Sequence, residues 1–192
     1  MTSNGLLKPK SAAETPQLMK VALGEEKADL TIVNAKVVNV YTGEILPNHG
    51  IGIKGKWIAY TGQNAKDTIG PRTKVIDAAG QTVIPGLIDG HTHIAWMFTV
   101  AEFLRYAVSG GTTTVVTETI EPYPVSGYEG VIDFLESLKD QPIKILATAP
   151  AMVSISRTAG DMPPETLAKL LARDDILGLG ESYWQAVLQE PE

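Results

Sequence analysis

The amino-acid sequence predicts an α/β protein in which a short β segment precedes alternating strands and helices. β-branched runs separated by Gly-containing turns fill residues 29–76, which is the pattern of short strands. From Gln81 onward, apolar strands alternate with segments whose apolar residues recur at helical spacing. Near-continuous apolar strands joined by helices indicate a parallel sheet with crossover helices.

The chain divides into three segments by this pattern. Residues 1–25 are expected to form a polar tail and one short helix, because Thr15-Pro16 provides an N-cap and a first-turn proline. Residues 26–80 contain about five short strands and are expected to form a small sandwich or sheet. Residues 81–192 contain the alternating strands and helices.

Four strands and three helices are expected after Gln81. The helices are predicted to begin at Thr99, at Ser126 and at Pro163-Pro164. The strands are TVIPGLIDG (82–90), TTTVVTE (112–118), IKILATAP (143–150) and ILGLGE (176–181). Four such strands fit an open doubly wound sheet or half of an eight-stranded barrel, and periodicity does not decide between them.

Composition limits the chemistry. The apolar fraction of 44% and the charged fraction of 20% are typical of a globular protein. A net charge of −6, with acids and bases interspersed, offers no basic patch for nucleic acid. The sequence has no cysteine, so a metal ion would be held by histidines and carboxylates. Without a signal peptide or an apolar run of membrane length, we expect a cytoplasmic protein with no membrane partner.

Two of the three histidines stand together after an apolar strand. Side chains alternate along a strand, so Asp89, His91 and His93 are expected on one face. Two imidazoles at this spacing can share one ion, although polar residues at a strand end can also merely hydrogen-bond. The third histidine, His49, is expected in a turn of the β segment.

These residues resemble the amidohydrolase superfamily. The segment PGLIDGHTH (85–93) is similar to its first barrel strand with the His-x-His metal pair, and VIDAAGQTVIPG is similar to the end of its N-terminal composite sandwich. The segments ADLTIVNAKVVNVYTGEI, SGGTTTVVTE and ILGLGE are similar to adenine deaminases in order and spacing. The resemblance implies the first half of a TIM-like (β/α)8 barrel, preceded by a small β-sandwich-type segment.

The resemblance also implies a ligand set. Glu181, at the end of ILGLGE, corresponds to a glutamate that bridges two metal ions in adenine deaminases. The implied metal ligands are therefore His91, His93 and Glu181, and the implied cofactors are divalent ions (Mn, Fe or Zn), two of them in the intact enzyme. On the residues alone, Glu181 is equally well read as a solvated carboxylate past a strand.

Two stretches depart from the adenine deaminase pattern. His-x-His-Ile is followed by Ala95-Trp96-Met97 in place of Glu-Ser-Ser, and Asp-Pro-His-Glu is replaced by residues 118–121, Glu-Thr-Ile-Glu. Glu118 and Glu121 are weak candidates for catalytic or substrate-binding roles, and Trp96 is a weak candidate for substrate binding. Tyr183 and Trp184 also lie near a strand end, where aromatic residues pack more often than they stack on a ligand.

The resemblance implies a metal-dependent hydrolase of a C–N bond in a small heterocycle, with adenine and water giving hypoxanthine and ammonia. The alternatives are a cyclic amide hydrolase of the same superfamily and a non-catalytic metal-binding or assembly half-domain. The chain is expected to be an incomplete N-terminal portion whose partners are the C-terminal half of the barrel, or another chain, and further copies of itself. We expect the isolated chain to be inactive or weakly active.

Overall fold

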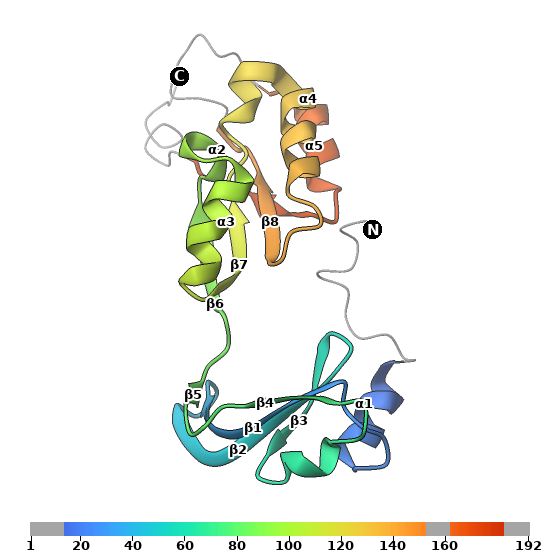
Figure 1. Ribbon diagram of the computed structural model, residues 1–192. Helices are drawn as coiled ribbons and strands as arrows, with labels where there is room; N and C mark the ends of the chain where they lie inside the picture. The colour runs from blue at the N-terminus through green and yellow to red at the C-terminus, as the bar shows by residue number, and fades with distance from the viewer. Residues whose placement is uncertain (1–13, 153–161, 183–192) are drawn as a thin grey trace. The chain divides into compact units, whose positions relative to one another are not determined.

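The computed structural model describes residues 14–152 and 162–182, and they form two compact units with their boundary in the chain between Pro85 and Gly86 (Figure 1). The predicted polar tail falls largely outside the described residues, as do Tyr183 and Trp184. Each unit is described by itself.

The first unit is a five-stranded sheet with one α-helix, α1 (Glu14–Ala22). Strands β3, β2 and β1 are neighbours in that order and antiparallel, whereas β4 and β5 both pair with β1 in parallel. Of the sandwich and the sheet left open by the sequence, the described residues form a single sheet. Its strands are β1 (Leu30–Asn39), β2 (Glu44–Lys54), β3 (Trp57–Gly62), β4 (Lys74–Asp77) and β5 (Thr82–Val83).

A small core holds this unit together. Alternating side chains of β1, including Val37, are buried together with Ile51 of β2 and Ala78, as expected for a half-buried strand. The 3₁₀ helix η2 (Ala65–Thr68) is attached to β1 by the buried hydroxyl pair Thr31 and Thr68, 2.8 Å apart. A buried polar pair of this kind stays satisfied and fixes the position of η2.

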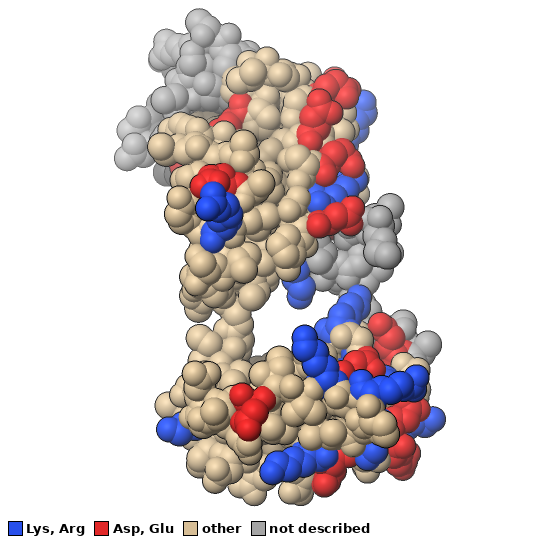
Figure 2. All heavy atoms as spheres, viewed as in Figure 1, with Lys and Arg blue, Asp and Glu red and all other residues tan. Residues whose placement is uncertain are grey.

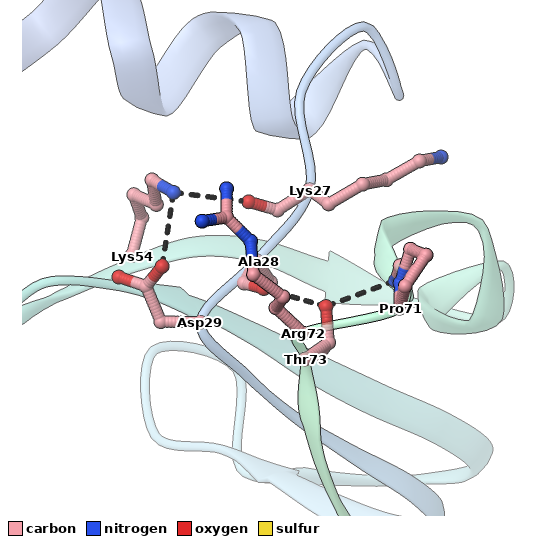
Figure 3. Close-up of a pocket in the computed structure, with 8 residues that line it drawn as sticks. Lys27, Ala28, Asp29, Lys54, Pro71, Arg72 and Thr73 are labelled. Carbon is pink, nitrogen blue, oxygen red and sulfur yellow. Dashed lines mark hydrogen bonds and ion pairs between the residues drawn. The ribbon is translucent and has the colours of Figure 1, made fainter.

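Asp29 links the start of β1 to the β2–β3 turn (Figure 3). Lys54 Nζ donates to Asp29 Oδ1 at 2.9 Å and to the Lys27 carbonyl at 3.2 Å, and Gly55 N donates to Asp29 Oδ2 at 2.8 Å. The Gly55 N–H and the Lys54 ammonium lower the pKa of the Asp29 carboxyl. Lys27, Asp29 and Lys54 line a hollow of about 380 Å³, in which both lysines already have polar partners.

The second unit is a four-stranded parallel sheet in the order β6-β7-β8-β9. Sequential neighbours are expected of a barrel, whereas a doubly wound sheet would place its first strand in the middle. The prediction of α/β units in barrel order is therefore confirmed, and the sheet does not close within the described residues. The strands are β6 (Leu87–Thr92), β7 (Thr112–Thr117), β8 (Lys144–Ala149) and β9 (Ile176–Leu179).

Helices cover this sheet and pack buried apolar side chains against it. Thr99 caps α3 by accepting the Glu102 N–H at 3.3 Å, as the Thr-x-x-Glu pattern predicts. Leu135 and Leu170 are buried on α4 and α5 with the strand side chains of β7 and β8. The helices are α2 (Ile94–Met97), α3 (Val100–Ser109), α4 (Pro122–Ser137) and α5 (Pro164–Leu171).

Two helix predictions need correction. The short helix α2 was not predicted, and α4 begins at Pro122 rather than at Ser126. Gly127, with φ 62° and ψ −153°, interrupts α4 so that the long helical segment resumes close to the predicted start. A glycine tolerates this conformation because it has no Cβ, which is why Gly127 can join two helical segments.

The predicted strand TVIPGLIDG is wrong as a single buried element. Thr82–Val83 belongs to the first sheet, Leu87–Thr92 begins the second, and Pro85 lies between them without an N–H to donate. Ile88 is 71% exposed because β6 is an edge strand of its sheet. In Figure 2 the surface over α3 carries a red and blue patch surrounded by uncharged residues, and within α3 Arg105 and Glu102 form an exposed ion pair at 3.1 Å.

Within the described residues, no helix combines the length and the apolar character that crossing a membrane requires.

Candidate metal centre

The end of β6 brings two imidazoles together. His91 lies in β6, and His93 follows it as the N-cap of α2. Both rings lie on one side, with the two Nε2 atoms 3.2 Å apart, as strand alternation predicts. Two anchors hold this backbone: Ile94 is fully buried in the core of the unit, and Asp89 Oδ1 accepts the His91 N–H at 3.2 Å.

Glu181 completes a group of three metal-ligating side chains. It follows β9, and its Oε2 lies 3.3 Å from His93 Nε2 and 3.9 Å from His91 Nε2. One donor atom from each of the three residues lies within 4.8 Å of the others. The carboxyl ends of the first and fourth parallel strands therefore present two imidazole nitrogens and a carboxylate oxygen to the same point.

Two further carboxylates face the other nitrogens of these rings. Glu121 Oε1 lies 2.5 Å from His93 Nδ1, and Glu118 Oε1 lies 3.6 Å from His91 Nδ1. Glu118 is only 3% exposed, and its second oxygen accepts the Glu181 N–H at 3.2 Å. Parallel pairing explains this arrangement, since Thr92 pairs with Thr117 and the Glu118 N–H donates to the Thr92 carbonyl at 2.8 Å.

A cavity of about 610 Å³ is lined by Trp96 and Glu121, two residues that contact His93, and neither imidazole lines it. Trp96 is 72% exposed, and its ring meets the His93 ring edge-on, with centroids 5.5 Å apart. His49 lies in β2 of the first unit rather than in a turn, and its Nδ1 pairs with the Pro47 carbonyl at 2.8 Å. It is not one of the three residues whose donor atoms converge.

The sequence did not predict the hydrogen bond between Glu118 and the Glu181 N–H, or that the missing side chain at Gly180 leaves room for this contact. A Cβ at residue 180 would overlap Glu118 Oε2 and would lie 2.7 Å from Thr148 Oγ1. The sequence did contain part of the information needed to predict this contact. Glu118 and Gly180-Glu181 both follow strands that end at the same edge of a parallel sheet.

The sequence shows which family has this fold and these residues. Residues 82–191 match the amidohydrolase family, and the chain belongs to that family.

Within it, the chain is similar to adenine deaminases. It is 42% identical over 171 residues to the adenine deaminase of Ruegeria sp. (strain TM1040), covering 86% of this chain and 28% of that protein. It is 39% identical over 175 residues to the adenine deaminase of Moorella thermoacetica, covering 88% of this chain and 29% of that protein. The chain thus spans less than a third of the length of these curated relatives.

Among solved structures, the β-aspartyl dipeptidase of Fervidobacterium islandicum AW-1 shares the fold. The match has a TM-score of 0.53 at 20% identity and covers 79% of this chain and 40% of the dipeptidase. At this identity the similarity concerns the fold alone.

Proposed function

We propose that the chain forms the first part of the active site of a metal-dependent hydrolase that cleaves a C–N bond in a small heterocycle, with adenine as the leading substrate. One observation carries the metal assignment: donor atoms of His91, His93 and Glu181 converge within 4.8 Å at the carboxyl edge of the parallel sheet. Similarity to the adenine deaminases of Ruegeria and Moorella supports the choice of substrate.

The donors fit a divalent transition ion. Two imidazoles and a carboxylate suit Zn²⁺, Mn²⁺ or Fe²⁺. Two nitrogens bound tetrahedrally at the usual zinc–nitrogen length would lie about 3.3 Å apart, and the two Nε2 atoms are 3.2 Å apart. Without a cation or a proton between them, two nitrogen lone pairs at this separation would repel each other.

His91, His93 and Glu181 would hold a divalent ion, which would act as a Lewis acid and lower the pKa of water towards neutrality. The chain's own side chains would bind the heterocyclic substrate. Trp96 offers an exposed ring at the cavity for a planar heterocycle to stack on, and Glu121 offers a carboxylate in the same wall. The proposed reaction is balanced as adenine and water giving hypoxanthine and ammonia.

Metal analysis and a substrate screen test this proposal together. Purified chain is loaded separately with Zn²⁺, Mn²⁺ and Fe²⁺, and the bound ion is measured by elemental analysis. A polypeptide as long as the relatives is then screened for ammonia release from aminopurines and aminopyrimidines, and for ring opening of cyclic amides.

We expect the chain to bind metal and the longer polypeptide to release ammonia from adenine. Ring opening without ammonia release would favour the cyclic amide alternative, and metal binding without any turnover would favour a non-catalytic role. Absence of bound metal would refute the proposal.

A further inference from the structure

Each imidazole of the candidate metal centre has its own carboxylate on the far nitrogen. His93 Nδ1 meets Glu121 Oε1 at 2.5 Å, and His91 Nδ1 faces Glu118 Oε1 at 3.6 Å. The first is a direct hydrogen bond and the second is an ion-pair distance. Both acids come from the four residues that follow β7, three positions apart.

Glu181 faces the Nε2 side of both rings, so the tautomer is settled by what Nε2 binds. A carboxylate accepts but does not donate, so a neutral imidazole that gives its Nε2 lone pair to a cation carries its hydrogen on Nδ1, towards the carboxylate there. The lone pair is then on Nε2, and the two Nε2 atoms are the ones that face each other and Glu181. A carboxylate behind a metal-binding histidine also raises the basicity of the ligand nitrogen.

Glu118 has a second task. Its Oε2 accepts the Glu181 N–H at 3.2 Å, and the side chain is 3% exposed, so its carboxylate is held among protein atoms. One buried side chain after β7 therefore contacts a ligand residue from the first strand and another from the fourth. Without the Glu118 side chain, the orientation of His91 relative to Glu181 would no longer be fixed. These two residues lie 90 positions apart in the sequence.

Glu121 is placed differently. It lines the cavity with Trp96, and its Oε2 is buried without a hydrogen-bond partner among the described residues. The oxygen bonded to His93 is thus fixed while the other remains available as an acceptor.

We infer that Glu118 and Glu121 are positioning residues, which hold His91 and His93 as Nδ1–H tautomers with both Nε2 atoms directed at one shared ion. The inference rests on the proposed metal-dependent function and deepens it. It assigns each acid to one histidine, and this specificity makes it testable.

The experiment reads the tautomers directly. The 192-residue chain is labelled with ¹⁵N-histidine, and long-range ¹H–¹⁵N spectra are recorded with Zn²⁺ bound and again without metal, both at pH 8, where a free imidazole is neutral. The variants are Glu118→Ala, Glu121→Ala and the near-isosteric Glu118→Gln and Glu121→Gln. Glu129→Gln, an exposed acid on α4, controls for the change in charge.

We expect both rings to be Nδ1–H tautomers in the zinc-bound wild type, and His93, with its direct hydrogen bond to Glu121, to keep this tautomer without metal. Glu121→Ala should shift His93 alone towards the Nε2–H form, and Glu118→Ala should shift His91 alone. The dissociation constant for Zn²⁺, measured against a chelator, should rise about 10- to 100-fold in the alanine variants. The glutamine variants should recover part of this loss because the amide oxygen still accepts, and Glu129→Gln should match the wild type.

Unchanged tautomers, or equal shifts of both rings in every variant, would overturn the inference. An unchanged zinc affinity in the alanine variants would do so as well, while leaving the proposed metal site intact. If the wild type binds no zinc, the proposed function fails, and the tautomer shifts still decide the roles of the two acids. Circular dichroism identifies any alanine variant that does not fold, in which case its glutamine counterpart supplies the comparison.

Discussion

The Glu118 carboxylate occupies the space that a side chain at Gly180 would need. A Cβ at Gly180 would overlap Glu118 Oε2 and approach Thr148 Oγ1 to 2.7 Å. The glycine therefore lets a buried acid after β7 reach the backbone of Glu181, which follows β9.

Gly180→Ala should displace the Glu118 carboxylate and weaken the metal centre. Overpacking a filled site typically costs about 1–3 kcal/mol, and we expect a loss of unfolding free energy in this range with weaker Zn²⁺ binding. Urea unfolding and chelator competition measure the two effects. Gly178→Ala is the matched control, because a Cβ at that position of β9 meets nothing within 4 Å. Equal losses in both variants would contradict the steric explanation.

His91→Ala and His93→Ala should each abolish tight metal binding by the chain. Each variant removes one of two imidazole donors that lie 3.2 Å apart, and a single imidazole with one partly exposed carboxylate holds a divalent ion poorly. Elemental analysis after dialysis measures the bound ion. His49→Ala serves as the control, since His49 lies in β2 and pairs with the Pro47 carbonyl. Retention of a full equivalent of metal in His91→Ala would count against the site.

The stability contribution of Asp29 should depend on pH. The Gly55 N–H and the Lys54 ammonium lower the pKa of Asp29 below its ordinary value of 3.8. The folded state therefore binds this proton less readily than the unfolded state. The stabilisation is present above the ordinary value and is lost as the pH falls through the lower folded value. Because the side chain is about half exposed, the effect is screened and modest.

Asp29→Asn should reduce the free energy of unfolding at pH 7, and the gap to the wild type should close as the pH falls below about 4. Urea unfolding of both proteins across this range measures the gap. Added salt should also narrow it, since the Lys54 contact is electrostatic. A gap that stays constant from pH 7 to pH 2 would show that the loss has another cause.

The features that the sequence predicted well depend on short-range patterns. His91 and His93 face the same side because side chains alternate along a strand, which is a pattern of three residues. The Thr99 cap follows from the Thr-x-x-Glu pattern, which spans four residues. The barrel order of the strands followed from alternation combined with the family resemblance. The three ligand candidates were predicted in the same way, and their role as metal ligands stays a prediction.

The features that were missed depend on neighbours distant in the chain. The exposure of Ile88 follows from the edge position of β6, which no local pattern reports. The Glu118 contact to the Glu181 N–H joins residues 63 positions apart. The break between β5 and β6 could have been recognised, because Pro85 cannot donate a ladder hydrogen bond within a continuous strand.

The 192-residue chain alone should deaminate adenine slowly or not at all. Within the described residues, three side chains form the candidate ligand set, and the His91 side chain is 55% exposed. A working site must fix its metal and place a proton-transfer group within reach of the reacting water. Loss of such a group typically costs about two to four orders of magnitude in rate. Glu118 is buried against His91 and Glu181, so its position suits holding these groups better than meeting a substrate.

An ammonia-release assay on metal-loaded chain measures this directly. The full-length Moorella adenine deaminase provides the positive control, and its N-terminal segment of matching extent provides the matched one. We expect both short polypeptides to fall below the full-length protein by at least about a hundredfold, which corresponds to the loss of one proton-transfer group. Metal-dependent turnover by the 192-residue chain near the full-length rate, abolished by His91→Ala, would show that residues 1–192 already contain a working site.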